Sequence, residues 1–343
     1  MSDSSSRLEA EIAEIPHLAR ARIAAIGDVD ALAARLRSRG LRSVITIGRG
    51  SSDGVCEALG RAAGVHAGLV AASLPPSLIT LDHARLDTRD ALALVVSQSG
   101  RSPDLIEATR HVRAGGAHVV GIVNVSGSPL AQVCDDVLLA GAAPEVSIAA
   151  TKSVVLSWLL GLRMVAGLGP RRGDDALWQA LPDVLARAVA VRPGDAVLAT
   201  LDAPAMIVLG RGQSLASARE IALKIKELAG INAEAISSAE VMHGPRAAIG
   251  PETAILALAM TAGPLDDALG VLSSLTQRIV IAGPAARQHA AFGSVIDVAG
   301  SDLPLADPIV TTSALYPLAV ALARRRGRDP DAPRGLMKVT LTR

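Results

Sequence analysis

Short apolar segments alternate with amphipathic segments along most of the chain. In the first half, four apolar segments are short enough to be buried parallel strands, and helix-like segments separate them. Ahead of them, Leu8, Ile12 and Ile15 predict one helix, and the pattern over 29–39 predicts another. This alternation is typical of a doubly wound α/β fold. The predicted strands are 43–48, 91–96, 117–123 and 135–140, and the helices between them lie near 52–63, 103–114 and 147–167.

The pattern is then repeated. IGRGSS at 47–52 returns as LGRGQS at 209–214, an offset of 162 residues, and three strand-like segments follow in the same order as before. The stretch 168–195, rich in Gly, Pro and charge around one amphipathic helix, predicts the connection. We therefore expect two tandem, doubly wound parallel-sheet domains of flavodoxin-like type. The later strand-like segments are 254–260, 278–283 and 294–300.

The composition fits a folded chain of this organisation. Of 343 residues, 50% are hydrophobic and 20% charged, which favours a sizeable core over disorder. Two Trp, one Tyr and one Phe are too few to fill that core, so aliphatic side chains must fill it. We assign an N-terminal helical segment to 1–40, a first domain to 41–170, a linker helix to 171–195, a second domain to 196–330 and a C-terminal tail to 331–343.

Charge and cysteine content exclude several classes of protein. A net charge of +1 and few aromatic residues argue against nucleic-acid binding. Cys56 and Cys134 form neither a disulfide framework nor a metal-ligand spacing, which fits a reducing cytoplasm. The polar, acidic N-terminus is unlike a signal peptide, and Pro and Gly interrupt the uncharged runs at 62–81 and 114–134, so we expect no membrane span.

Lysine is rare in this chain. Only four of the 34 basic residues are lysines, namely Lys152, Lys224, Lys226 and Lys338. Unlike a guanidinium group, a lysine amine can lose its proton and attack a carbonyl carbon. The scarcity raises the hypothesis that some of the four have chemical roles.

A polar turn follows the predicted strand at 91–96. Its sequence, SQSGRSPD at 97–104, ends with Ser102 as a helix N-cap and Pro103 at the first helical position, so it surrounds a helix N-terminus that can bind an anion. Gly50 and Ser51 let the backbone approach the same anion. The glycine spacing in GRGSSDG fits a dinucleotide fingerprint poorly. The second copy lacks these hydroxyls, and an ordinary Ser/Gly turn remains the alternative.

Charged residues in the second copy suggest acid–base chemistry. Glu220, Lys224 and Glu227 lie on one face of a predicted helix with apolar flanks, which predicts burial; a solvated row of salt bridges is the alternative. His243, beside a Gly-Pro turn and near Glu240, is placed as a general acid or base would be, or has a structural role. Lys338, in an apolar stretch, is predicted to be desolvated with a lowered pKa, unless it lies in a frayed terminus.

These motifs together resemble the SIS (sugar isomerase) double-domain family, and specifically the isomerase half of glucosamine-6-phosphate synthase. The resemblance covers roughly residues 10–343. It is carried by GRGSS, SQSG, APEVSIAATK (143–152), GRG with ALKIKE (210–227), AEAISSAEVMHGP (233–245) and DAPRGLMKVT in the tail.

The resemblance implies a sugar-6-phosphate ligand, a homodimer and no metal or cofactor. Glu227 matches the acid/base that moves a proton between sugar carbons 1 and 2. His243 matches a ring-opening histidine that the neighbouring subunit supplies, and Lys338 matches a lysine that forms an imine with the open-chain ketose. The phosphate would be held by Ser97, Gln98, Ser99 and Ser102, the sugar lined by Ile148 and Met337, and Glu145, Thr151 and Lys152 match without an assigned role.

The sequence also departs from the synthase. Ile47-Gly48-Arg49-Gly50 stands where the synthase has Cys-Gly-Thr-Ser, so Arg49 or Ser51 would have to replace a phosphate-binding hydroxyl, and Arg101 replaces an acidic residue. The sequence begins Met-Ser without the nucleophilic Cys that opens a glutaminase domain, so we expect no built-in ammonia source. The chain therefore resembles the isomerising glucosamine-6-phosphate deaminases, which release fructose-6-phosphate and ammonia.

Three other functions remain open at this stage. One is synthesis in the reverse direction, with ammonia that is free or comes from a separate glutaminase chain. Another is a related phosphosugar isomerase or deglycase. The third is a non-catalytic sugar-phosphate sensor, which the presence of Glu227, His243 and Lys338 together disfavours.

Overall fold

Two five-stranded parallel sheets form the core of the fold, which confirms the predicted tandem α/β architecture. The computed structural model of the protein describes residues 5–170 and 174–338. Within this part, the chain divides into two compact units, each built on one sheet. The first unit comprises 17–145, 152–170, 174–179 and 337–338, and the second comprises 5–16, 146–151 and 180–336. The domain boundaries assigned from the sequence stay predictions.

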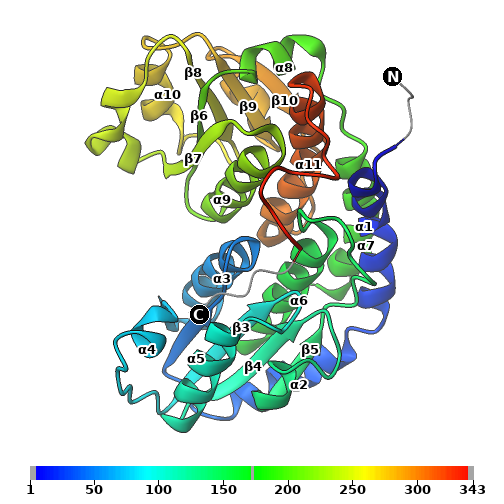
Figure 1. Cartoon of the computed structure of the whole chain (residues 1–343), viewed down its shortest axis with the longest axis vertical. Helices are drawn as coiled ribbons and strands as arrows, with labels where there is room; N and C mark the ends of the chain where they lie inside the picture. Colours follow the sequence, from blue (N-terminus) through cyan, green and yellow to red (C-terminus); the bar gives the residue numbers. More distant parts are fainter. Residues whose placement is uncertain (1–4, 171–173, 339–343) are drawn as a thin grey trace. The chain divides into compact units, whose positions relative to one another are not determined.

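The first sheet has the strand order β2-β1-β3-β4-β5, and all its pairs are parallel. The strand β3 lies at its centre, and every residue of β3 is buried, as expected for a sheet covered on both faces. Figure 1 shows β3, β4 and β5 in succession. The strands are β1 (Ser43–Ile47), β2 (Val70–Ser73), β3 (Ala91–Ser97), β4 (His118–Val123) and β5 (Asp136–Leu139).

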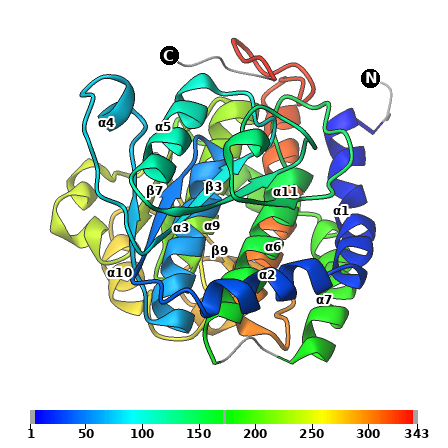
Figure 2. The same ribbon diagram turned by 90° about the horizontal axis from the view of Figure 1, so that it is seen from below.

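Helices cover both faces of this sheet. On one face, α3 and α2 both pack against α6, and all residues of α6 are buried (Figure 2). On the other face, α4 and α5 contact each other above a cluster of aliphatic side chains from β1, β3 and β4. The helices are α2 (Gly27–Arg37), α3 (Ser51–Ala62), α4 (Ser77–Thr80), α5 (Pro103–Ala114) and α6 (Lys152–Leu168); α1 (Arg7–Ala24) and α7 (Asp175–Val189) have residues in both units.

The second sheet repeats the first, with the order β7-β6-β8-β9-β10. Here α9 and α11 pack together beside β6, while α10 joins an aliphatic cluster with side chains of β8 and β9. The strands are β6 (Ala205–Gly210), β7 (Asn232–Ser237), β8 (Thr253–Leu258), β9 (Ile279–Gly283) and β10 (Ser294–Asp297), and the helices are α8 (Asp195–Leu201), α9 (Ser214–Lys224), α10 (Asp266–Leu272) and α11 (Asp307–Arg325).

The repeat extends to local backbone geometry. The helix after the first strand of each copy ends in a π-helical turn, Ala63–Ala67 in one copy and Ile225–Ala229 in the other, again 162 residues apart. Each turn is closed by a left-handed glycine, Gly68 or Gly230. Because π-helical turns are rare and cluster at functional sites, the turn that contains Glu227 is a notable position for a candidate catalytic residue.

One predicted helix begins later than expected. The pattern predicted a helix from 147, but α6 begins at Lys152, and 146–151 is irregular. The backbone N–H groups of Val146 and Ser147 donate to the Glu11 carboxylate, at 2.6 and 3.2 Å, and are not part of a helix. The N–H of Ser153 donates to the Glu145 carboxylate at 3.1 Å, which fixes the first turn of α6.

A single helix in the described part of the chain, Pro304–Arg325, is long and apolar enough to cross a membrane by length and composition. The sequence analysis did not single it out. Within its most apolar 18-residue stretch, 83% is buried inside the structure, as in the core helix of a globular domain. The cytoplasmic location stays a prediction.

A glycine at the end of the first strand lets the following helix return closely in both copies. A Cβ built on Gly48 would lie 2.8 Å from the Ser52 carbonyl oxygen, and one on Gly210 would lie 2.7 Å from the Leu215 Cα. We expect Gly48→Ala and Gly210→Ala each to lower the free energy of unfolding by about 1–3 kcal/mol, because backbone has to move. Denaturant unfolding followed by circular dichroism measures this.

The matched control is Gly270→Ala in α10, where a Cβ meets nothing within 4 Å. Alanine favours a helix over glycine by about 1 kcal/mol, so this variant should unfold at the same or a higher denaturant concentration. Equal stability of all three variants would contradict the close approach.

Candidate functional site

The candidate phosphate-binding residues lie at one edge of the first sheet. β1 and β3 are hydrogen-bonded neighbours, with Ile47 opposite Val95, so the turns that follow them begin side by side. The chain leaves β1 toward the α3 face and leaves β3 toward the α5 face, and open parallel sheets bind ligands outside the strand ends where such connections diverge. The structure therefore brings Arg49, Gly50 and Ser51 to the same edge as the turn at 97–102.

The turn after β3 has a defined shape. The N–H of Gly100 donates to Ser97 Oγ at 3.1 Å, and the N–H of Arg101 donates to Ser99 Oγ at 3.3 Å. Gly100 has a φ of 61°, and a Cβ there would lie 2.2 Å from Ser128 Oγ, so only glycine fits. As predicted, α5 begins at Pro103 with Ser102 as its N-cap. The Ser102 hydroxyl makes no capping hydrogen bond, and Gln98 and Ser99 are partly exposed.

Arg49 contributes a cation to this edge, and a buried carboxylate holds it. Its guanidinium group donates to Asp104 Oδ2 at 3.0 Å through Nε and at 2.9 Å through Nη2. The Asp104 side chain is 2% exposed, whereas that of Arg49 is 48% exposed. The pair links the turn after β1 to the first turn of α5, and it leaves part of the guanidinium accessible to a ligand. Gly50, before α3, has a φ of 54°.

Lys338 lies in the same unit and forms an ion pair. Its Nζ is 3.1 Å from Glu145 Oε2, and the Glu145 side chain is fully buried. The apolar neighbours Leu336 and Met337 do not cover Lys338, because they are 40% and 77% exposed; the Lys338 side chain is 24% exposed, and its amine meets a carboxylate. The desolvation of this amine stays a prediction. The apolar residues next to Lys338 in the sequence do not determine its surroundings, because its amine contacts Glu145, which lies 193 positions away. Val339 and the rest of the tail lie outside the described residues.

Asn124, which the sequence analysis missed, shapes the approach to Glu145. It follows β4, and its side chain donates to the Ala143 carbonyl at 2.8 Å and accepts from the Ala142 N–H at 2.9 Å. Ala143 has a φ of 54°, which is costly for a residue with a Cβ. The two hydrogen bonds compensate this strain. A polar residue at the carboxyl end of β4 was the signal that could have identified Asn124.

In the second unit, Glu220, Lys224 and Glu227 form the buried row that the spacing predicted. Lys224 Nζ hydrogen-bonds to Glu227 and lies 3.9 Å from Glu220 Oε1. The side chains of Glu220 and Lys224 are 1% exposed, so the solvated alternative is wrong. Glu227, in the π-helical turn, is 21% exposed. The hydroxyl of Tyr316, on α11, donates to Glu220 at 3.1 Å. The sequence analysis did not predict this contact. The rarity of tyrosine was the signal that could have pointed to Tyr316, because it is the only tyrosine in the sequence.

The remaining candidates lie on irregular segments. His243 and Glu240 belong to the short 3-10 helix Glu240–His243 and are exposed, and Gly244 follows with a φ of 148°. Ile148 is partly buried in the irregular segment before α6, where Thr151 and Lys152 are buried. Lys338 and the phosphate-type turn thus lie in the first unit, whereas Glu227 and His243 lie in the second.

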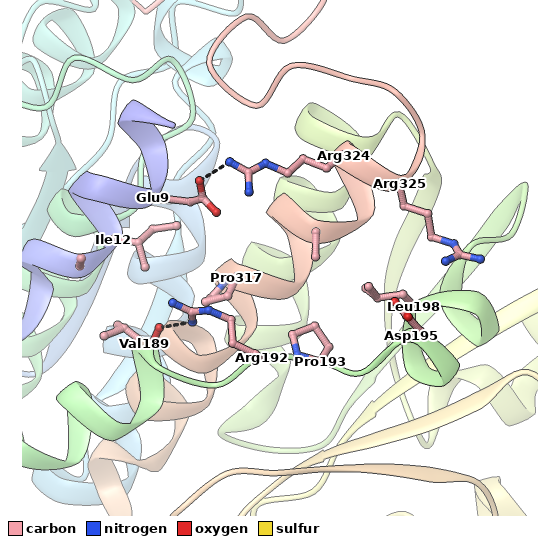
Figure 3. Close-up of a pocket in the computed structure, with 12 residues that line it drawn as sticks. Glu9, Ile12, Val189, Arg192, Pro193, Asp195, Leu198, Pro317, Arg324 and Arg325 are labelled. Atoms are coloured by element: carbon pink, nitrogen blue, oxygen red, sulfur yellow. Dashed lines mark hydrogen bonds and ion pairs between the residues drawn. The ribbon is translucent and has the colours of Figure 1, made fainter. Parts of the chain in front are cut away.

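A pocket of about 550 Å³ in the second unit contains none of the candidate residues (Figure 3). Ile12, Leu198 and Pro317 contribute apolar surface to it. Of its three arginines, Arg324 pairs with Glu9, Arg325 pairs with Asp202, and Arg192 donates to the carbonyl groups of Val189 and Val191. Because Glu9 and Asp195 also line the pocket, it is a weaker candidate for a phosphate site than the edge of the first sheet.

Comparison with known proteins agrees with the motifs. The SIS domain model matches residues 39–165 and 201–281. Glutamine–fructose-6-phosphate aminotransferase (isomerizing) of Mycolicibacterium paratuberculosis is 31% identical over 271 residues, which are 73% of this chain and 43% of that protein. The chain therefore spans less than half the length of this relative.

Two solved structures share the fold over most of their length. A candidate phosphosugar isomerase from Silicibacter pomeroyi DSS-3 superposes with a TM-score of 0.84 at 35% identity, covering 95% of this chain and 100% of that one. Glucosamine-6-phosphate deaminase from Thermotoga maritima has a TM-score of 0.71 at 19% identity, covering 92% and 99%. At 19% identity, the likeness to the deaminase concerns the fold alone.

The two cysteines are poor nucleophiles in this structure. Burial, with the charge of Asp53 nearby, raises the pKa of the Cys56 thiol far above its usual range. Burial and the charge of Asp135 raise the pKa of Cys134 to about 12. A thiol with a raised pKa forms little thiolate at neutral pH, so cysteine chemistry does not account for this site.

We therefore expect both thiols to react slowly with a disulfide reagent at pH 8 in the native protein. Both should react within the mixing time in denaturant, where burial is lost. Absorbance of the released thiolate counts the reacted groups. Rapid reaction of one thiol per native chain would show that its burial is wrong.

Proposed function

The chain belongs to the SIS domain family, and we propose that it is an isomerising glucosamine-6-phosphate deaminase that releases fructose-6-phosphate and ammonia. The observation that carries this proposal lies in the first unit. There, a lysine amine held on a carboxylate and a hydroxyl-rich turn at a helix N-terminus occur together. A phosphate anchor and an imine-forming amine are what an open-chain phosphosugar requires.

The substrate phosphate binds first, at the carboxyl edge of β1 and β3. The hydroxyls of Ser97, Ser99 and Ser102, the amide of Gln98 and the N-terminus of α5 supply donors. Arg49 and Ser51 replace the hydroxyl that the segment Ile47-Gly48-Arg49-Gly50 lacks, and the Arg49 side chain, which is 48% exposed, adds positive charge.

The chemistry then proceeds on the open-chain sugar. His243 transfers the proton that opens the ring, and Glu227 moves a proton from carbon 2 to carbon 1, which turns the carbon 2 amine into an imine. The neutral amine of Lys338 adds to carbon 2 and displaces ammonia. Water then hydrolyses the Lys338 imine, which releases the ketose and restores the ammonium group. These steps use no metal or cofactor.

The buried row of the second unit prepares Glu227 for this task. Lys224 holds the Glu227 carboxylate, Glu220 lies on the other side of Lys224, and the Tyr316 hydroxyl fixes Glu220 by donating to it. The exposed His243 fits a homodimer in which the neighbouring subunit supplies it to the sugar.

The reaction itself gives the first test. Purified protein mixed with glucosamine-6-phosphate alone should release one ammonia per fructose-6-phosphate formed, measured by coupled assays for each product. Glucosamine without the phosphate should give no product, because the phosphate provides the anchor. Absence of ammonia release, with synthesis of glucosamine-6-phosphate from fructose-6-phosphate and ammonium, would reverse the proposed direction. Activity on a different phosphosugar only would contradict the substrate.

Two variants separate binding from chemistry. Lys338→Arg keeps the positive charge and cannot form the imine, so kcat should fall at least a thousandfold while phosphosugar affinity changes little. Ser99→Ala removes one phosphate donor and should mainly raise KM, about tenfold for a loss near 1.4 kcal/mol. Steady-state kinetics and calorimetric binding measure both. Full turnover by Lys338→Arg would eliminate the imine role.

A further inference from the structure

Glu145 is the carboxylate that touches the reactive amine. Its Oε2 accepts from Lys338 Nζ at 3.1 Å, and its side chain is fully buried although the lysine remains partly accessible. The sequence comparison matched Glu145 to a motif without giving it a role. Its burial means that it is desolvated, and such a carboxylate interacts strongly with a nearby proton.

Hydrogen bonds to residues just before Glu145 and to its own carboxylate fix its position. Before it, Asn124 clamps the backbone of Ala142 and Ala143. After it, Ser153 in the first turn of α6 donates its N–H to Oε1 at 3.1 Å and its hydroxyl to Oε2 at 2.6 Å. A carboxylate held by several hydrogen bonds is oriented before the substrate arrives, and Lys338 Nζ contacts its Oε2.

We propose that Glu145 is a catalytic residue, the proton acceptor and donor for Lys338 during imine formation and breakdown. This inference rests on the proposed function. With fructose-6-phosphate, the Lys338 ammonium group first gives one proton to Glu145. The neutral amine then forms a bond to carbon 2 of the sugar. One of the two remaining amine protons moves to the carbon 2 oxygen, which becomes a hydroxyl. Glu145 then protonates the resulting hydroxyl, which leaves as water, and a protonated imine remains.

The proton count supports a single carboxylate. An ammonium group and a carbonyl group become a protonated imine and one water, with no net gain or loss of protons or charge. One group that borrows a proton and returns it is therefore sufficient. The other charged side chain on the adjoining start of α6 is Lys152, which is buried, and a second ammonium cannot accept a proton. Ser153 and Asn124 are neutral.

The test is reduction of the imine by borohydride. The full-length protein is mixed with fructose-6-phosphate and sodium borohydride, and mass spectrometry follows the rate at which the reduced sugar adduct appears on Lys338. Glu145→Gln keeps the size of the side chain and can still accept from the Ser153 N–H, but it cannot take the proton. We expect trapping to slow about a hundredfold at pH 7 and to recover as the pH rises, because hydroxide then deprotonates the amine.

Ser153→Ala is the matched control. It removes one hydrogen bond to Glu145 and leaves the carboxylate and its ion pair in place. Because the Ser153 hydroxyl orients Oε2, we expect trapping to slow by less than in Glu145→Gln and to keep the pH dependence of the wild type. Thermal unfolding and the affinity for fructose-6-phosphate show whether either variant disturbs the fold or the phosphate anchor.

The outcomes separate the two proposals. If wild-type protein gives no adduct on Lys338, the proposed function fails. If wild-type protein gives the adduct and Glu145→Gln forms it at the same rate and with the same pH profile, the role of Glu145 is wrong while the proposed function stands. Equal slowing in Glu145→Gln and Ser153→Ala, without alkaline recovery, would show that Glu145 only supports the start of α6.

Discussion

The winding of each sheet reverses between its first and third strands, and this reversal decides where polar groups can gather. In the first sheet, β2 lies on one side of β1 and β3 on the other, so the connections after β1 and β3 leave toward opposite faces. Backbone amides and short polar side chains can then face a ligand at the carboxyl edge without entering the apolar core. The glycines Gly48 and Gly100 permit the close turns on either side of that edge.

The same topology exists twice, but only the first copy has the serine-rich turn SQSGRS at this edge, whereas Thr261-Ala262-Gly263 follows β8 in the second. The second copy instead carries buried charge: Lys224 lies between Glu220 and Glu227 in an otherwise apolar layer. Burial of such groups costs free energy unless each is paired, and here Lys224 pairs with both glutamates while Tyr316 donates to Glu220. In the first unit, the buried Glu145 carboxylate is likewise paired, with the Lys338 amine. Under the proposed function, the anchor and the amine belong to the first copy and the carboxylate for proton transfer belongs to the second.

Much of this organisation could be predicted from the sequence, because it depends on local patterns. Strand and helix positions follow from the spacing of apolar residues, and the repeat in IGRGSS and LGRGQS indicated two similar domains. The row on α9 followed from helical spacing alone. The polar turn at 97–102 was predictable because a single segment supplies it.

The remaining features depend on contacts between distant residues. Glu145 meets Lys338 across 193 positions, and Glu220 meets Tyr316 across 96. Local context favoured an apolar setting for Lys338 because Leu336 and Met337 flank it, yet both are exposed. The start of α6 was misplaced because the apolar pattern continues into a segment whose N–H groups bind Glu11. The spacing of residues along the sequence does not predict which distant side chains come into contact in the folded chain.

The most direct test of the central claim is a crystal structure of the protein soaked with fructose-6-phosphate. The account predicts the phosphate at the turn formed by 97–102 in the first unit, with continuous density between Lys338 Nζ and carbon 2 of the sugar. Density for the phosphate at the corresponding turn after β8, or for a sugar bound with Lys338 still paired to Glu145 and distant from carbon 2, would contradict it.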